Sequence, residues 1–441
     1  MPDKKIVVAG AGHGGLVSAI KLCENGYDVT VYEKSNEASM GYDWTDDFDI
    51  NVFDEVELPR PRKSTYYLKH NWTFVSPDKE TYVSINIPEA DRDVSMERKP
   101  LIKHLIDLAK ETGVKIHYGI TVKGPCIEND KVVGIIFDDG NAVRADLVID
   151  AAGLKSPIRE QLPDGYGVVK KWKERESFFN WRAHYERLDG PEPKHDATVY
   201  FKHLGHPGIS WVVYAPNNEV NVLIGQTSPL DETIIEETLS DLRAEHPCLG
   251  NEVVRGGLIT EIPIRRPLDM MVGDNYAAVG DSAFMTIPVM GSGIAASMIA
   301  GDILAKILIK NSELDNPYCL ESLWPYQAKF FQQLGAGFTS IELMKNYLLG
   351  IPEEDLNFLF SRNIIGAKEL SNSATGGELS LSIVDVVTKL VRGIIKAPLL
   401  LEIKKLTDKC SKVKEVCTKI PDEYDAERVR KWQNAVNKYF K

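Results

Sequence analysis

The chain has 441 residues, which is enough for two or three packed domains of about 100–200 residues each. Its 43% hydrophobic and 26% charged residues are typical of a soluble globular protein, and its formal net charge of -12 disfavours a broad nucleic-acid-binding surface. The six scattered cysteines form no CxxC pair, so neither a zinc site nor an iron–sulfur cluster is predicted.

The N-terminal residues have the pattern of a strand, a helix and a second strand. The two strands are expected at Lys5–Ala9 and Tyr27–Tyr32, and the helix at about Leu16–Glu24. Residues 10–15 between the first strand and the helix read Gly-Ala-Gly-His-Gly-Gly. Such glycines permit a tight turn whose backbone N–H groups reach a pyrophosphate, and a carboxylate after the second strand accepts hydrogen bonds from ribose hydroxyls. The predicted dinucleotide-binding residues are Gly10, Ala11, Gly12, Gly14, Gly15, Glu33 and Lys34.

Two later blocks, residues 64–88 and 176–226, alternate between apolar and polar residues as antiparallel strands do. A helix is expected at about 99–112, followed by strand-like segments up to residue 152. From residue 276 the strand–glycine–helix pattern of the N-terminus returns, and from about residue 311 the chain is expected to be helical.

The glycine motif alone does not separate FAD from NAD, but two later segments favour FAD. Residues 146–153 read Asp-Leu-Val-Ile-Asp-Ala-Ala-Gly, and residues 276–283 read Tyr-Ala-Ala-Val-Gly-Asp-Ser-Ala. Asp281 follows an apolar strand, where its carboxylate can hold a ribityl hydroxyl. The segment Gly291-Ser292-Gly293 exposes backbone where a helix begins at Ile294. The dipole of that helix suits the negative charge that collects at N1 and the C2 carbonyl of a reduced flavin.

These three segments, in this order, resemble the aromatic-hydroxylase-like flavoproteins and, more closely, the geranylgeranyl reductases. The resemblance covers about residues 4–310 and extends to the reductase-like segments Ile264–Leu268 and Ile209–Gly225. It implies that Arg98, which follows Met96-Glu97 at the start of a helix, contacts FAD. The residues expected to bind FAD beyond the first motif are then Arg98, Ala152, Gly153, Asp281, Gly291, Ser292, Gly293 and Ile294.

The expected fold is α/β, with a Rossmann-type FAD-binding domain, an inserted antiparallel β-sheet substrate domain and a C-terminal helical region. The FAD-binding domain is assigned to residues 1–60, 92–170 and 250–310, and the antiparallel substrate domain to residues 61–91 and 171–249. Residues 311–441 form the helical region.

The leading functional hypothesis is reduction of a carbon–carbon double bond in an apolar, prenyl-like substrate, with hydride transferred from N5 of the reduced flavin. One alternative is a dehydrogenase or monooxygenase of an aromatic compound, and another is a flavin electron-transfer protein that serves a protein partner or quinone. Hydroxylases usually carry Asp-Gly where this chain has Ala152-Gly153, and His where it has Phe284, which disfavours hydroxylation. The loop Met40–Ile50 lacks the Cys-Gly of archaeal geranylgeranyl reductases.

The substrate site is predicted only in outline. Four aromatic residues are expected to line an apolar pocket, namely Trp44, Trp181, Trp211 and Tyr214. An acid-rich loop that contains Asp43, Asp46, Asp47 and Asp49 is either solvated or supplies an acid or base near the flavin. No catalytic residue is predicted. The chain shows no second dinucleotide motif, so the electron donor is expected to be NAD(P)H that visits the flavin transiently, or a reduced ferredoxin or flavodoxin.

The C-terminal region combines an apolar stripe with a local excess of basic residues. Between Lys389 and Lys419 there are nine basic and three acidic residues. The stripe either packs on the body of the protein or forms an interfacial helix on anionic lipid. Because nothing resembles a signal peptide or a spanning segment, the expected location is the cytoplasm, with the inner membrane face as the site of any peripheral contact. The stripe consists of Ile383, Val384, Val387, Leu390, Val391, Ile394 and Ile395.

Overall fold

The structure is a computed structural model that describes residues 4–374 and 396–441. Its central sheet has six strands, and β1 pairs in parallel with β2 on one side and β12 on the other. The strand residues Ile6, Val7 and Val8 are fully buried, as expected of a strand covered on both faces. The strand order is β18 (Val272–Gly273), β19 (Tyr276–Ala278), β12 (Leu147–Asp150), β1 (Lys5–Ala9), β2 (Asp28–Glu33) and β8 (Lys115–Tyr118).

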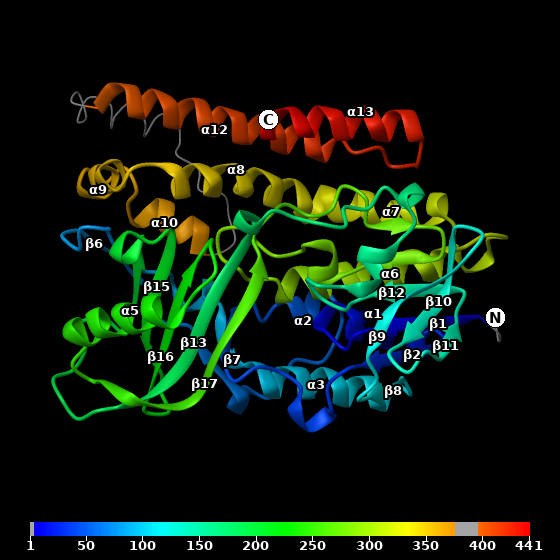
Figure 1. The fold of residues 1–441 in the computed structure, drawn as a ribbon, viewed down its shortest axis with the longest axis horizontal. Helices are drawn as coiled ribbons and strands as arrows, with labels where there is room; N and C mark the ends of the chain where they lie inside the picture. The colour runs from blue at the N-terminus through cyan, green and yellow to red at the C-terminus, as the bar shows by residue number, and fades with distance from the viewer. Residues whose placement is uncertain (1–3, 375–395) are drawn as a thin grey trace.

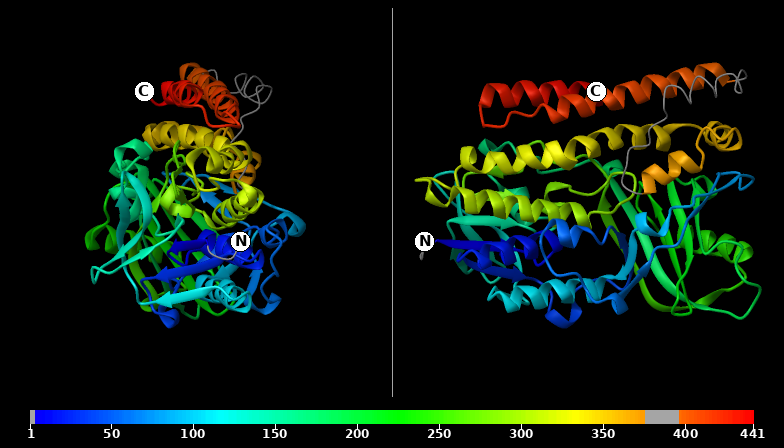
Figure 2. Two further views of the ribbon diagram at one scale, coloured as in Figure 1. Left: turned by 90° about the vertical axis from the view of Figure 1, so that its right-hand side faces the viewer. Right: turned by 180° about the vertical axis from the view of Figure 1, so that it is seen from behind.

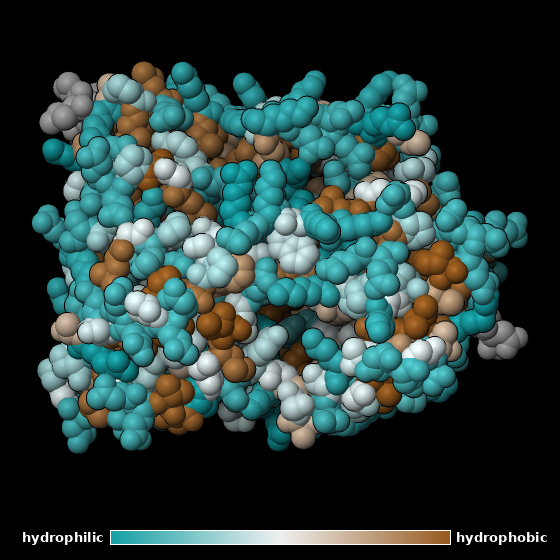
Figure 3. Space-filling view, in the orientation of Figure 1, coloured by the Kyte–Doolittle hydropathy of each residue, from teal (hydrophilic) through white to brown (hydrophobic). Residues whose placement is uncertain are grey.

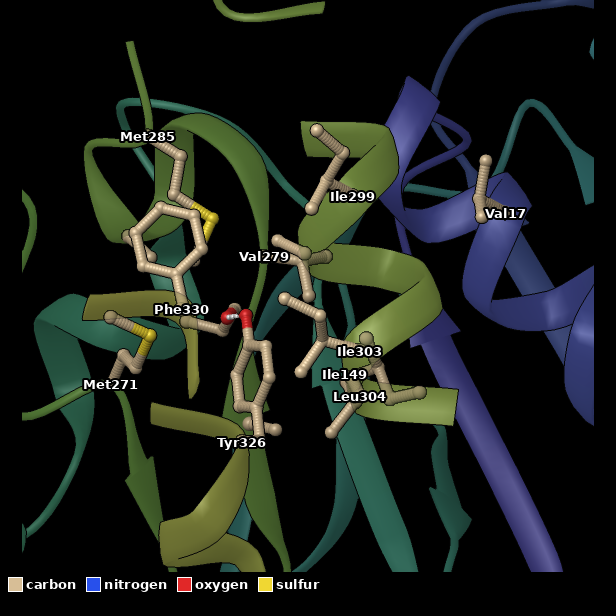
Figure 4. Packing of buried hydrophobic residues seen from close by; sticks show 14 of the residues in the cluster. Val17, Ile149, Met271, Val279, Met285, Ile299, Ile303, Leu304, Tyr326 and Phe330 are labelled. Atoms are coloured by element: carbon tan, nitrogen blue, oxygen red, sulfur yellow. Dashed lines mark hydrogen bonds between the residues drawn. The ribbon is translucent and has the colours of Figure 1, made fainter. Parts of the chain in front are cut away.

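Helices cover this sheet and pack closely on one another (Figure 1). Those around the FAD motifs are α1 (His13–Glu24), α3 (Arg98–Glu111), α4 (Pro157–Gln161) and α6 (Ile294–Lys310). Helix α1 begins at His13, three residues before its predicted start at Leu16 and inside the glycine loop itself. In Figure 4, Val17 of α1 and Ile303 of α6 lie in the core that also contains Tyr326 of α7 (Leu320–Phe330). The Tyr326 hydroxyl donates to the carbonyl oxygen of Ala278 at 2.8 Å, which ties α7 to β19.

Two three-stranded sheets accompany the central one. The first contains β9 (Val122–Glu128), β10 (Lys131–Phe137) and β11 (Ala142–Arg144), and β10 packs against β12. The second contains β3 (Thr45–Phe48), β7 (Val94–Glu97) and β4 (Tyr66–Leu68). The short helix α2 (Val52–Glu55) follows β3. The second sheet places Asp46 and Asp47 of the acid-rich loop on a strand, β3, whereas Asp49 is exposed.

A seven-stranded sheet forms the other half of the molecule. Its order is β17 (Leu249–Pro263), β13 (Ser177–Arg187), β16 (Glu219–Gln226), β15 (Gly208–Tyr214), β14 (Ala197–Phe201), β5 (Thr73–Val75) and β6 (Tyr82–Ser84). The prediction that the FAD-binding domain resumes at residue 250 is wrong in this detail. β17 pairs with β13 from Ser177↔Pro263 to Arg187↔Leu249, so residues 250–263 complete the antiparallel sheet. The boundary was missed because β17 is a bulged edge strand without a regular alternation of polar and apolar residues.

The exposed edge of this sheet carries apolar side chains. In Figure 3 hydrophobic residues gather in small, separate groups on a mostly hydrophilic face, and some of them lie over β17. The β17 residues Val253, Val254, Leu258 and Ile259 are between 47% and 59% exposed. Helix α5 (Glu232–Glu245) covers one face of the sheet, so its opposite face is the one available to a substrate.

The C-terminal helices extend over both halves of the molecule (Figures 1 and 2). Helix α7 continues through a π-helical turn, Phe331–Gly335, into α8 (Ala336–Gly350), which is followed by α9 (Glu353–Ser361) and α10 (Ala367–Ala374). The chain ends in α12 (Ala397–Thr418) and α13 (Ala426–Asn437). Helix α12 packs along α8 and buries Leu400, Ile403 and Val413. The predicted apolar stripe Ile383–Ile395 lies outside the described residues.

No helix in the described ranges is both long enough and apolar enough to cross a bilayer. Within the same ranges, no three His, Cys, Asp or Glu side chains are grouped as a metal site would require.

A buried histidine lies beneath α5. The His246 Nε2 and Nδ1 atoms lie 2.9 Å and 3.1 Å from the hydroxyls of Tyr200 and Tyr214. The Tyr200 hydroxyl also donates to the Glu245 carboxylate at 2.9 Å, so it accepts from an Nε2–H, while Tyr214 donates to Nδ1. This pattern satisfies the neutral imidazole. Burial lowers the pKa of His246 from 6.5 to about 4.

We expect the free energy of unfolding to fall as the pH decreases from about 6.5 to 4, because in this window the unfolded chain binds a proton that the folded His246 does not. A pKa difference of this size between the folded and unfolded states changes the free energy of unfolding by about 3 kcal/mol over this pH window. His246→Gln should reduce that slope in urea titrations at several pH values, whereas His117→Gln, at an exposed position, should not. A slope that His246→Gln leaves unchanged would assign the acid sensitivity to other groups.

Candidate active site

The glycine loop lies at the carboxyl end of β1, between β2 and β12. Gly10 has a φ of +98°, which L side chains rarely adopt, and a Cβ there would collide with the carbonyl of Ala151. A Cβ on Gly14 would lie 2.6 Å from the carbonyl oxygen of Ser297 in α6, and one on Gly15 would lie 2.7 Å from the Cβ of Ala151. The glycines are therefore required for close contact between α1, β12 and α6.

Glu33 closes this loop from the end of β2. Its carboxylate accepts hydrogen bonds from the backbone N–H of Ala11 at 2.9 Å and of Ser35 at 2.8 Å. Each carboxylate oxygen retains a free lone pair, so the side chain can also accept from a ribose hydroxyl. The neighbouring Lys34 is exposed.

Glu33→Ala should weaken FAD binding by roughly 10- to 100-fold. The substitution removes charge-assisted hydrogen bonds of about 1.5–3 kcal/mol and frees the Ala11 N–H. Fluorescence of flavin released during dialysis measures the effect, and Glu37→Ala, at an exposed glutamate that pairs with Lys110, is the control. Equal FAD retention in both variants would contradict a ribose role for Glu33.

The second motif fixes the end of β12. The Asp150 carboxylate accepts from the backbone N–H of Ala152 at 3.1 Å and from the Ser156 hydroxyl at 2.5 Å. Gly153 adopts a φ of +84°, and its N–H donates to the hydroxyl of Ser282 at 3.0 Å. The second and third motifs are thus joined directly, as a single cofactor site requires.

The third motif brings Asp281 to the start of α6. Asp281 is in the turn after β19 and accepts from the Thr286 hydroxyl at 2.9 Å. Burial raises the pKa of Asp281, and the Arg98 guanidinium opposes that rise. Gly293 is the N-cap of α6, and a Cβ there would lie 3.6 Å from the Asp281 carboxylate.

Arg98 lies between these motifs at the first position of α3. Its guanidinium donates two hydrogen bonds of 2.6 Å each to the Asp46 carboxylate, a partner that the sequence did not indicate. The ring centroids of Trp44 and Tyr42 lie 4.9 Å and 5.6 Å from the guanidinium carbon. Burial and the nearby Arg98 charge lower the pKa of His13 to about 3, which keeps the imidazole in the glycine loop neutral.

These residues fit FAD on three structural observations. No side chain caps the N-terminus of α1 at Gly12 or that of α6 at Gly293, so both helix ends present free N–H groups to an anion. The glycine cradle leaves no room for a side chain at Gly10, Gly14 or Gly15. Among the described residues, the buried Nε2 of His13 and Nε1 of Trp44 have no protein partner.

A large apolar cavity begins at the N-terminus of α6 and extends across the open face of the seven-stranded sheet. Its free volume is about 280 Å³. The loop Pro288–Ile294 forms one end, and Trp44, Asp46 and Asp47 of the β3 region lie beside that end. The sheet contributes mainly Phe74, Phe178, Val199, Phe201, Ile209, Trp211 and Leu223. The cavity therefore joins the expected flavin position to an elongated apolar space.

The C-terminal helices form the far wall of this cavity. The wall residues from α8 to α10 are Lys345, Leu348, Leu349, Leu356, Phe360, Ile365 and Leu370. The sequence predicted the helices but not this role, because contacts across more than 100 residues leave no local signal in the pattern. Burial lowers the pKa of Lys345 to about 8, and its ammonium group donates to the carbonyl oxygen of Ile264.

The predicted substrate aromatics divide between the two faces of the sheet. Trp44 and Trp211 line the cavity, but Trp181 and Tyr214 pack in the cluster beneath α5 on the opposite face. The assignment of Trp181 and Tyr214 to the pocket is therefore corrected. Side chains alternate across a strand, so Trp211 and Tyr214, three residues apart on β15, must face opposite sides.

The FAD binding domain family matches residues 3–313 of this chain. The chain is 23% identical over 427 residues to the digeranylgeranylglycerophospholipid reductase of Sulfolobus acidocaldarius, a match that covers 94% of this chain and 93% of that protein. It is 27% identical over 326 residues to digeranylgeranylglycerophospholipid reductase 1 of Methanopyrus kandleri, a match that covers 70% of this chain and 82% of that protein. The chain belongs to the FAD binding domain family, and its predicted resemblance to the geranylgeranyl reductases is confirmed.

Solved structures share the fold of this flavoprotein. A geranylgeranyl bacteriochlorophyll reductase-like protein from Thermoplasma acidophilum has a TM-score of 0.71 at 17% identity and covers 91% of this chain and 99% of its own. A probable FAD-dependent monooxygenase from Pseudomonas aeruginosa has a TM-score of 0.60 at 17% identity, covering 81% and 99%. The predicted fold class and FAD cofactor are therefore confirmed, and the protein is an FAD-dependent oxidoreductase.

The position at which hydroxylases usually carry His is buried in this flavoprotein. Phe284 is 0% exposed, and the guanidinium carbons of Arg159 and Arg265 each lie 4.8 Å from its ring centroid. Phe284 is not among the residues that line the cavity, and it ends the turn that contains Asp281.

Proposed function

We propose that the protein reduces carbon–carbon double bonds in the prenyl chains of a lipid. The elongated cavity carries the proposal, because it runs from the α6 N-terminus over apolar side chains from sheet and helices. A prenyl chain has the matching shape and polarity. The names of the curated relatives, digeranylgeranylglycerophospholipid reductases, support this substrate class.

Bound and reduced FAD supplies hydride at N5. The residues of this chain position the alkene and exclude water. Ile209, Trp211 and Leu223 form an apolar floor on the sheet, and Phe360 and Leu370 close the space from the helices. The uncapped N-terminus of α6 stabilises negative charge on the flavin ring. The electron donor that we infer is NAD(P)H, or a reduced ferredoxin or flavodoxin, that reaches the flavin without a dedicated nucleotide domain.

The test is a single turnover without oxygen. The FAD-loaded enzyme is reduced photochemically and mixed with a geranylgeranyl glycerolipid, a free aromatic acid or buffer. We expect flavin reoxidation only with the prenyl lipid, and a product heavier by two hydrogen atoms for each reduced double bond. Reoxidation by the aromatic compound, or incorporation of labelled oxygen on aeration, would favour the monooxygenase alternative. No reoxidation by any prenyl lipid would reject the proposal.

A further inference from the structure

Three polar residues form a row across the β3–β7–β4 sheet at the flavin end of the cavity. Asp47 of β3 pairs in register with Ser95 of β7, which pairs in register with Tyr67 of β4. Residues opposite one another in antiparallel strands share a face, so the three side chains lie side by side. The Ser95 hydroxyl donates to the Asp47 carboxylate at 2.6 Å, and the Tyr67 hydroxyl hydrogen-bonds with Ser95.

Asp47 stands at the boundary of two cavities. It lines the large apolar cavity together with the loop Gly291–Gly293, and the Ser292 hydroxyl donates to its backbone carbonyl at 3.3 Å. It also lines a small polar cavity, of about 20 Å³, together with Tyr67, Ser95 and His70. That volume holds about one water molecule, and the walls offer it several hydrogen-bond partners.

A cation and a second carboxyl group lie next to Asp47. The Lys69 ammonium lies 3.5 Å from Asp47 and 3.6 Å from Asp93, so two carboxyl groups share one cation. Burial raises the pKa of Asp93, and the Asp47 charge adds to that rise. The other charged or titratable groups near this row are Arg182, His70 and Glu97. Arg182 lies between Trp44 and Trp211, at 5.4 Å and 5.2 Å from their ring centroids.

Several other polar groups of the large cavity are, like Asp47, engaged with protein partners. Asp46 accepts both hydrogen bonds from Arg98. Lys345 and Lys202 donate to the backbone carbonyls of Ile264 and Ile351. Asp47 is thus a carboxyl group that lines the cavity and lies next to the loop Gly291–Gly293. The small cavity on its other side offers a route to further protons.

We propose that the Asp47 carboxyl delivers the proton that completes reduction of the double bond, and that Ser95, Tyr67 and water in the small cavity return a proton to it. This inference rests on the proposed function. In the step, the π bond of the alkene breaks and two C–H bonds form. One takes the hydride that reduced FAD supplies, and the other takes the proton released as the Asp47 O–H bond breaks. The alkene gains two electrons, and FAD returns to its oxidised form.

The experiment compares Asp47→Asn with the parent in the anaerobic single turnover. We expect flavin reoxidation by a geranylgeranyl glycerolipid to slow roughly 100-fold, the lower end of what a positioned general acid contributes. Asp47→Glu should recover part of the rate, and Ser95→Ala should slow it roughly tenfold.

Two further measurements separate chemistry from structure. The dissociation constant of a fully saturated analogue, read from the shift it causes in the flavin spectrum, should change by less than about twofold in Asp47→Asn if only a proton is lost. Asp91→Asn, which alters an exposed carboxylate that lines neither cavity, should leave both readouts unchanged.

Parent-like reoxidation in Asp47→Asn would overturn the inference. So would Lys345→Met, if it alone reproduced the losses expected of Asp47→Asn. A parent enzyme that reduces no prenyl alkene would reject the proposed function and the role of Asp47 together. If the parent and Asp47→Asn both reduced the prenyl alkene at the same fast rate, only the role of Asp47 would be rejected.

Discussion

Gly14→Ala is expected to release FAD and to lower the free energy of unfolding by about 1–3 kcal/mol, the usual cost of inserting a methyl group into closely packed structure. The new Cβ would lie 2.6 Å from the carbonyl oxygen of Ser297, so α1 and α6 must separate. The opposing surface is equally close, because a Cβ on Gly301 of α6 would collide with the carbonyl oxygen of Gly14. Any separation moves both helix N-termini that face the cofactor.

Gly12→Ala is the matched control two residues earlier. A Cβ on Gly12 would meet nothing closer than the Ala151 carbonyl oxygen at 3.7 Å, and its φ of -72° suits an alanine. The apo protein should keep its stability within about 0.5 kcal/mol, while FAD binding weakens if the pyrophosphate lies against this position. Urea titration of apo protein and flavin fluorescence of the loaded protein measure the two effects separately. Parent-like behaviour of Gly14→Ala in both would contradict the contact between α1 and α6.

The cofactor half of the site could be predicted from sequence because its requirements are local. A turn with a φ of +98° at Gly10 and a carboxylate at the end of β2 both lie within one short β–α–β segment. The strands and the helix of that segment are sufficient to place both features. Arg98 needed the family resemblance, and its partner Asp46 could not be predicted, because they are separated by β4 to β7 and meet only after folding.

The substrate half depended on which face of a strand a side chain occupies. Sequence pattern identified the alternating strands but not which face α5 would cover. Trp211 and Tyr214 were therefore assigned together, although a spacing of three residues on one strand places them on opposite faces. The wall from α8 to α10 and the row Asp47–Ser95–Tyr67 arise from the packing of separate segments, and no local pattern contains that information.

Arg98→Met should destabilise the protein by about 3 kcal/mol, near the lower end of the range for breaking a buried ion pair. The Arg98 and Asp46 side chains are 21% and 10% exposed, so the carboxylate left behind is largely cut off from water. The variant also loses the guanidinium that stacks on Trp44 and Tyr42. As a control, Arg60→Met breaks the exposed pair of Arg60 with Asp54, 39% and 60% exposed, and should cost less than about 1 kcal/mol.

The double variant Arg98→Met with Asp46→Leu separates the structural role of the pair from its role toward FAD. The double variant should regain most of the stability that Arg98→Met loses, because the second substitution removes the unpaired buried carboxylate. FAD retention should not recover, because the Arg98 charge also acts on Asp281 and on His13 of the glycine loop, and Asp46→Leu restores neither effect. Urea denaturation gives the stability of each variant, and equilibrium dialysis gives the FAD affinity. If the double variant regained FAD affinity along with stability, Arg98 would serve only to neutralise Asp46, and the contact with FAD inferred from the family resemblance would be wrong.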